Sequence, residues 1–139
     1  MTIYDYFAAL ERGIKRNRKI GYLAEPLVAV VFDEHRGFLH CDVFFWDGSR
    51  LAISETVDTS PGYPRVTDYS YTYLRENQHV FRYDNAPHHP ELRTFPHHKH
   101  VGPDEVPIAA EQPTLAQVFA EVGTYLSAEA GGPGASSNG

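Results

Sequence analysis

The sequence predicts an α+β protein with a single domain, in which an N-terminal helix, an antiparallel sheet of four or five strands and a C-terminal helix follow one another. The first observation is that apolar residues recur at helical spacing near both ends of the chain, whereas they alternate by two in between. The second is the length of 139 residues, which suits one hydrophobic core. The C-terminal helix is expected to pack on one face of the sheet. The predicted domain comprises residues 1–126, and the Gly/Ser-rich residues 127–139 are expected to form a disordered tail.

The first predicted helix runs from Thr2 to Ile20. Thr2 suits the N-cap position, and Asp5 three residues later completes an approximate capping box. The apolar stripe of this helix consists of Ile3, Phe7, Leu10 and Ile14. Its last turns carry a group of cations that includes Arg16, Arg18 and Lys19. This group is either a solvated helix end that matches the helix dipole or a patch that contacts phosphate.

Alternating apolar residues predict five strands in the middle of the chain. They are Leu27–Phe32, Phe38–Trp46, Leu51–Val57, Asp68–Arg75 and His79–Asp84. Asp47-Gly48 between two of these runs is a strong hairpin signal. In the last strand, alternation puts Arg82 and Asp84 on the face opposite to Phe81 and Tyr83.

A short extended piece is predicted at Phe95–Val101, after an irregular segment that contains two prolines. In this conformation His98 and His100 share one face, and His97 and Lys99 share the other. A second amphipathic helix is then predicted, with the N-cap and apolar stripe Thr114, Leu115, Val118, Phe119, Val122 and Leu126.

Charge and cysteine content exclude several classes of protein. The formal net charge of −6 argues against a protein that is basic over its whole surface, but it permits a local basic site. The single cysteine, Cys41, cannot form an intramolecular disulfide or a thiolate zinc site. No apolar run reaches the length of a membrane span, and the first residues lack the features of a signal peptide. We therefore expect no membrane association and a cytoplasmic location.

Histidines are concentrated in one part of the chain. Six of the eight lie between Tyr69 and His100, at His79, His88, His89, His97, His98 and His100. Imidazole titrates near neutral pH, so such a group suits proton transfer, metal binding or phosphate binding. For a metal, His98 and His100 would supply two ligands and His88 or Asp84 a third, but no standard metal-ligand spacing is present. We expect no cofactor.

Metal-free cleavage of RNA requires a base, an acid and a cation that stabilises the phosphorane. We expect His98 and His100 to form the acid–base pair and Arg82 and Lys99 to supply the positive charge. His88 is a further catalytic candidate. The competing interpretation for the neighbouring residues is structural, because core packing already explains the aromatic side chains and a salt bridge would explain Arg82.

Four motifs resemble the TumE-type toxin family. They are Tyr-Ser-Tyr-Thr-Tyr (69–73), Phe-Arg-Tyr-Asp-Asn-Ala-Pro-His-His (81–89), Thr-Phe-Pro-His-His-Lys-His (94–100) and Trp-Asp-Gly-Ser-Arg-Leu-Ala-Ile-Ser-Glu (46–55). The similarity covers about Leu27 to Leu126. It implies the toxin half of a toxin–antitoxin pair that is encoded beside a helix-turn-helix antitoxin and acts on RNA or translation. The matching candidate site residues are Arg82, Asp84, His88, His89, His97, His98, Lys99 and His100, and Glu55 is an additional candidate acid on the sheet.

The leading hypothesis is a small cytoplasmic toxin with metal-independent endoribonuclease activity. Its expected partners are RNA and a cognate antitoxin, and a homodimer is possible. The candidates for substrate binding are Tyr71, Tyr83, His89, His97, Asp84, Glu55, Arg16, Arg18 and Lys19. Two alternatives stay open, namely a zinc- or manganese-dependent hydrolase or nuclease that uses the same histidines, and a non-enzymatic module that binds nucleic acid or protein.

Overall fold

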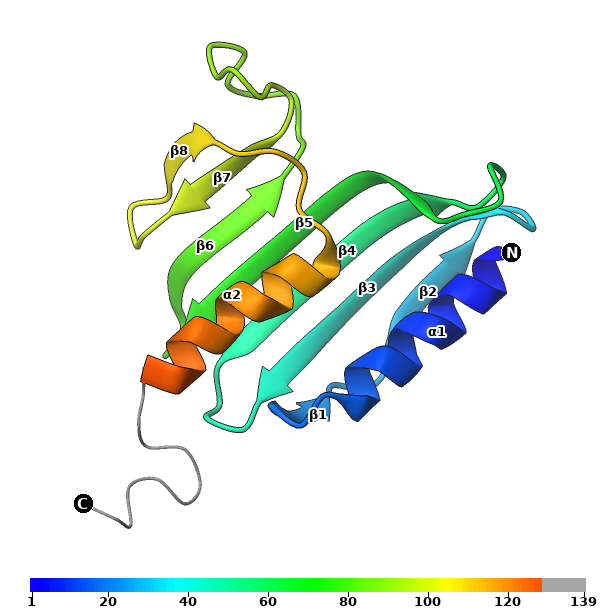
Figure 1. Ribbon diagram of the computed structural model, residues 1–139, viewed down its shortest axis with the longest axis horizontal. Helices are drawn as coiled ribbons and strands as arrows, with labels where there is room; N and C mark the ends of the chain where they lie inside the picture. Colours follow the sequence, from blue (N-terminus) through cyan, green and yellow to red (C-terminus); the bar gives the residue numbers. More distant parts are fainter. Residues whose placement is uncertain (129–139) are drawn as a thin grey trace.

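The computed structural model describes residues 1–128, which form two helices and one antiparallel sheet (Figure 1). In chain order the elements are α1 (Ile3–Arg16), β1 (Ile20–Leu23), β2 (Val28–Val31), β3 (Arg36–Phe45), β4 (Arg50–Asp58), β5 (Arg65–Arg75), β6 (Gln78–Asp84), β7 (His98–Val101), β8 (Val106–Ala109) and α2 (Leu115–Ala128). The predicted α+β class is therefore confirmed.

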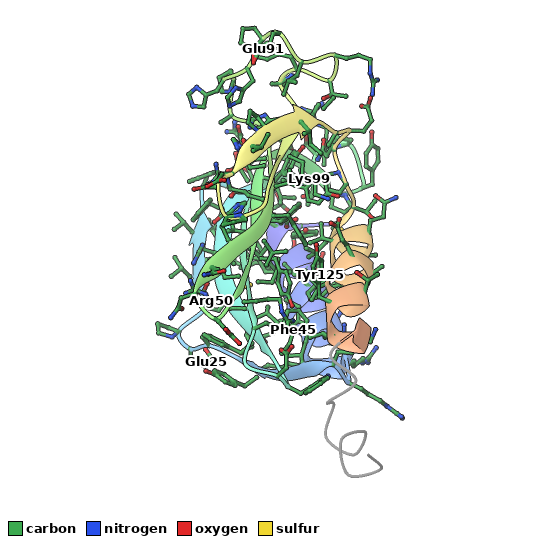
Figure 2. All side chains as sticks on the ribbon, turned by 90° about the vertical axis from the view of Figure 1, so that its left-hand side faces the viewer. Glu25, Phe45, Arg50, Glu91, Lys99 and Tyr125 are labelled. Carbon is green, nitrogen blue, oxygen red and sulfur yellow. The ribbon has the colours of Figure 1, made fainter. Side chains whose placement is uncertain are left out.

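The sheet has a simple topology in which, from β2 onwards, each strand pairs with the next one along the chain. Its strand order is β1-β3-β4-β5-β6-β7-β8, and β2 pairs with β3 beside β1. All the pairs are antiparallel. Seen edge-on in Figure 2, α1 and α2 lie on the same side of the sheet, and no helix of residues 1–128 covers the other face. We call this second side the open face.

The α1 helix begins as the sequence predicts but ends earlier. Thr2 caps it, and its hydroxyl and the Asp5 carboxylate form a complete capping box. The helix stops at Arg16, so the prediction of a helix up to Ile20 was wrong at its C-terminal end. Ile20 instead starts β1, which pairs with the end of β3.

The sheet has eight strands, more than the four or five expected. The five predicted strands correspond to β2 through β6, and the predicted extended piece contains β7. The two strands without a predicted counterpart, β1 and β8, have four residues each and lie at opposite ends of the strand order. Both are short strands whose hydrogen bonds come from β3 and β7, so pairing with these partners defines them.

The core lies between the sheet and the two helices. Strands β3 and β4 show strict alternation of buried and partly exposed residues, and β5 continues it along the second half of the strand. The largest fully buried side chains include Tyr71, Tyr73, Phe81, Leu39, Leu51 and Ile53. The α2 helix starts after Thr114, as predicted, and contributes Val118, Val122 and Leu126 to the core.

The predicted tail begins at residue 127, and its first two residues form the end of α2. The rest of that tail lies outside the described residues. Within residues 1–128, neither helix is long and apolar enough to cross a membrane.

Candidate functional site

Two neighbouring strands bring four polar side chains together on the open face. In the antiparallel pair of β6 and β7, Arg82 lies opposite His100, and Asp84 lies opposite His98. Phe81 on the same strand faces the core, so alternation turns Arg82 and Asp84 the other way. The sequence predicted separately that Arg82 and Asp84 share a face of one strand and that His98 and His100 share a face of the other. The register between β6 and β7 then brings the two pairs together.

These side chains line a pocket of about 590 Å³ on the open face. Its other walls come from β3, β4 and β5, which contribute side chains such as Phe38, Ser54 and Ser70. The segment after β6 supplies the rim, where His88 and His89 also line the pocket. His98 and His100 are only 2% and 8% exposed, so they form the floor, whereas His88 is exposed.

Asp84 is the centre of a polar network at this floor. One carboxylate oxygen accepts from Arg82 Nε at 3.0 Å, and the other lies 3.0 Å from His98 Nε2. The second oxygen also accepts the backbone N–H of Ala86. Arg82 in turn donates from Nη1 to Glu105 at 2.9 Å, so its guanidinium is held between two carboxylates. The predicted salt bridge is therefore present, and it is part of the pocket.

The hydrogen bonds of the imidazoles determine which ring nitrogens face the pocket. His98 Nδ1 lies 2.9 Å from the carbonyl oxygen of Pro96, and His100 Nδ1 lies 3.1 Å from that of Glu105. A carbonyl oxygen only accepts, so both Nδ1 atoms must carry a proton. In the neutral ring each Nε2 is then an unprotonated electron-pair donor. The ring centroids of His98 and His100 are 4.8 Å apart, and His89 packs edge-on against both at 5.2 and 5.5 Å.

Electrostatics favour the neutral form of His100. Burial, together with the neighbouring charges of Arg82 and His98, lowers the pKa of His100 below its ordinary value. The Glu105 carbonyl and the Asp84 carboxylate act in the opposite direction but do not prevail. A neutral imidazole is able to accept a proton or to bind a cation.

The rim of the pocket is anchored to the sheet at both ends. Asn85 donates to the Thr67 carbonyl and accepts the Tyr69 N–H, which fixes the chain where it leaves β6. Thr94 donates to the His97 carbonyl and accepts the N–H of Ala110, just after β8, which fixes the chain where β7 begins. Between these anchors His89 has a φ of 62°, in the left-handed region that histidine adopts more readily than most residues.

Several predicted site residues lie on the helix side of the sheet and not in the pocket. Lys99 donates to Glu121 of α2 at 2.6 Å, and its ammonium lies 4.8 Å from the Tyr83 ring centroid. In Figure 2 it lies on the same side as Tyr125 of α2. Tyr83 itself donates to Glu121 at 2.6 Å. The expectation that Lys99 acts beside His98 and His100 is therefore not met, and alternation along β7 already contained the signal for this.

The side chains of Glu55, Tyr71 and His97 also point to the helix side, although Glu55 is among the residues that line the pocket. Glu55 is 1% exposed, and its two oxygens accept from the hydroxyls of Tyr6 and Tyr71, each at 2.5 Å. Burial raises the pKa of this carboxyl, although the two hydroxyls oppose the shift. The His97 ring stacks on Tyr69 and shares a 2.9 Å hydrogen bond with its hydroxyl. These contacts join the sheet to α1 and to the rim segment.

The basic residues at the end of α1 are distant from the pocket along β3. The Lys19 carbonyl accepts the N–H of Trp46, just after the end of β3, whereas the pocket meets β3 near its start at Phe38. Arg16 and Arg18 are exposed. The three cations thus lie apart from the histidines.

Sequence reasoning missed one member of the site, Glu105. Its carboxylate pairs with Arg82, and its carbonyl holds His100. Glu105 follows Gly102 in the turn between β7 and β8, where both residues have positive φ. The Gly-Pro pair at 102–103 was a turn signal, but only the hairpin geometry brings Glu105 back to β6.

The fold and the pocket define a small α+β protein with a polar, histidine-lined site on the open face of its sheet. The sequence matches the family described as Toxin TumE over residues 14–128, and the chain belongs to this family. It is thus the toxin component of a toxin–antitoxin system, and its partner is an antitoxin. No curated protein and no solved structure matches the chain.

Proposed function

We propose that this toxin cleaves RNA, and that the pocket on the open face is its reactive centre. The observation that carries the proposal is the convergence of Arg82, His89, His98 and His100 in one solvent-accessible pocket. A guanidinium binds a phosphate group, and imidazoles transfer protons or bind a metal near neutral pH. RNA in the cytoplasm is the substrate that this chemistry suits, and we expect a cognate helix-turn-helix antitoxin to restrain the activity.

The metal-free route uses only side chains of the pocket. A neutral imidazole, for which His100 is suited by its lowered pKa, takes the proton of a ribose 2′-hydroxyl. The 2′-oxygen then bonds to phosphorus, and the bond to the 5′-oxygen breaks as an imidazolium, expected to be His98, gives that oxygen a proton. Arg82 stabilises the charge of the phosphorane. The products are a 2′,3′-cyclic phosphate and a 5′-hydroxyl.

Metal-assisted hydrolysis is the second route, and one observation favours it. One nitrogen from each of His89, His98 and His100 lies within 4.8 Å of the others. In an in-line displacement the base and the acid act from opposite sides of phosphorus, which suits two imidazoles that are separated by the phosphate. Three adjacent imidazoles suit a single cation better.

The test is cleavage of end-labelled RNA by the purified full chain, with and without EDTA, followed by analysis of the new ends. We expect Arg82→Gln to lower the cleavage rate by about 100-fold or more, as for other groups that stabilise charge in the transition state. Arg50→Gln is the matched control, because Arg50 is at the far end of β4 from the pocket residues Ser54 and Thr56.

Equal rates for the parent chain and Arg82→Gln would remove the pocket from the mechanism. Binding of RNA without cleavage, by folded protein and on several RNA substrates, would instead favour a non-enzymatic binding module.

A further inference from the structure

The rings of His89, His98 and His100 form the densest group of potential metal ligands among residues 1–128. Each ring can offer one nitrogen, and these three nitrogens all lie within 4.8 Å of one another. Ligands of one tetrahedral zinc ion lie about 3.4 Å apart, as follows from Zn–N distances of about 2.1 Å. His98 and His100 come from the β7 strand and His89 comes from the rim segment, so the three nitrogens have to draw closer together to reach one ion.

The Nδ1 atoms of the three histidines lie beside oxygen atoms, as the second ring nitrogen does in metal sites. Metal-bound histidines usually donate their second N–H to a backbone carbonyl or a carboxylate, which fixes the tautomer and orients the ring. His98 and His100 donate from Nδ1 to the carbonyls of Pro96 and Glu105. His89 Nδ1 lies 3.4 Å from the Glu91 carboxylate. All three rings thus have an oxygen beside Nδ1 and leave Nε2 for a ligand.

The short distance between His98 and Asp84 indicates that a positive charge, either a proton or a metal ion, lies between them. His98 Nε2 lies 3.0 Å from one Asp84 oxygen, and His100 Nε2 lies 3.7 Å from the other. Both Nδ1 atoms donate to carbonyls, so in the neutral rings the Nε2 atoms carry no proton. These unprotonated Nε2 atoms would then face the Asp84 carboxylate. Electron-pair donors at this distance repel each other unless a proton or a metal ion lies between them. Asp84 therefore supplies the negative charge that a dication needs, even though Arg82 also binds it.

We infer that His89, His98 and His100 bind one divalent transition-metal ion of the zinc class, beside the Asp84 carboxylate. Three histidines with an open fourth position form a typical catalytic zinc site, and imidazole also suits other late first-row metals. Such an ion would polarise a phosphoryl oxygen and lower the pKa of a bound water. The binding itself does not depend on the proposed function, whereas the role of the ion in RNA cleavage rests on it.

The test is titration of EDTA-treated, buffer-exchanged full chain with Zn²⁺ in a calorimeter, and with Co²⁺ by visible absorption, which reports the coordination geometry. We expect one ion per chain. His89→Asn should weaken Zn²⁺ binding by about 100-fold or more, since loss of even an outer partner costs 10- to 100-fold. Asparagine tolerates the positive φ at this position, so the rim should keep its path.

His88→Asn is the matched control for metal binding, because His88 is the exposed neighbour of His89 and lies outside the three-ring cluster. His98→Asn provides a second variant, and circular dichroism tests whether this buried change leaves the fold intact. If His98→Asn does not fold, His89→Asn decides by itself. Absence of stoichiometric binding would overturn the inference, as would an equal loss of affinity in His88→Asn and His89→Asn.

Parallel RNA assays separate the two proposals. Zinc binding by the three histidines without RNA cleavage supports the metal site and removes the proposed function. Full cleavage in EDTA by protein that binds no metal removes the metal site and leaves the proposed function intact.

Discussion

Replacing Asp84 by alanine removes the carboxylate that joins the pocket floor. Asp84 is 7% exposed and contacts Arg82, His98 and the Ala86 N–H at 3.0 Å each. Breaking a buried ion pair by removing one partner costs about 3 to 5 kcal/mol. The side chain of Arg82 is 31% exposed and keeps Glu105 as a second partner. Solvent screening and Glu105 therefore reduce the free energy lost when Arg82 is left without Asp84. We therefore expect Asp84→Ala to lower the free energy of unfolding by about 3 kcal/mol.

The assay is urea unfolding followed by circular dichroism in EDTA, so that cation binding does not contribute. For a domain of this size, the expected loss corresponds to a fall in Tm of about 10 °C. The exposed Asp104, changed to alanine, is the matched control and should stay within about 0.5 kcal/mol of the parent. A double-mutant cycle with Arg82→Ala measures the coupling of the pair. A loss of less than about 1 kcal/mol for Asp84→Ala would refute the view that this carboxylate holds the floor together.

The remaining predictions concern residues on the helix side of the sheet. Because burial raises the pKa of Glu55, the contribution of this carboxyl to stability is complete below its ordinary pKa of 4.5 and is lost as pH rises through the raised pKa of the folded state. Glu55→Gln should therefore flatten the fall in unfolding free energy as pH rises above 4.5. Urea titrations at several pH values that give the parent and Glu55→Gln the same slope would contradict this. Lys99→Ala should destabilise the chain by about 1 to 2 kcal/mol, since it leaves the partly buried Glu121 without its cation, and should change RNA cleavage by less than about threefold. A 100-fold loss of cleavage in folded Lys99→Ala would return Lys99 to the mechanism. Burial raises the pKa of the Cys41 thiol to about 12, so a thiol reagent at pH 8 should label Cys41 only after denaturant is added; rapid labelling of native protein would show that this strand opens.

Much of the fold could be predicted because alternation and helical spacing depend on neighbouring residues. The α+β class, the capping box at Thr2 and the central strands all follow from such local patterns. The length of α1 was overestimated because Arg18 and Lys19 suit a helix end as well as the turn that they occupy. The short strands β1 and β8 were missed because their hydrogen bonds come from β3 and β7, which no local pattern reports.

The sequence by itself determined which side chains of each strand share a face. It paired Arg82 with Asp84 and His98 with His100, and it separated Lys99 from both histidines, although residue type then suggested that Lys99 should act with them. Local spacing fixes the side of a strand to which a residue points, because the period of a strand is two residues.

Only the tertiary structure decided how these faces combine into a site. The register of β6 and β7 sets His98 against Asp84 and His100 against Arg82, and hydrogen bonding between strands distant in the chain determines that register. The rim segment adds His89, and the turn before β8 adds Glu105. The same packing placed Glu55 in the core with two tyrosines, because the helices cover one face of the sheet and leave the other to the histidines.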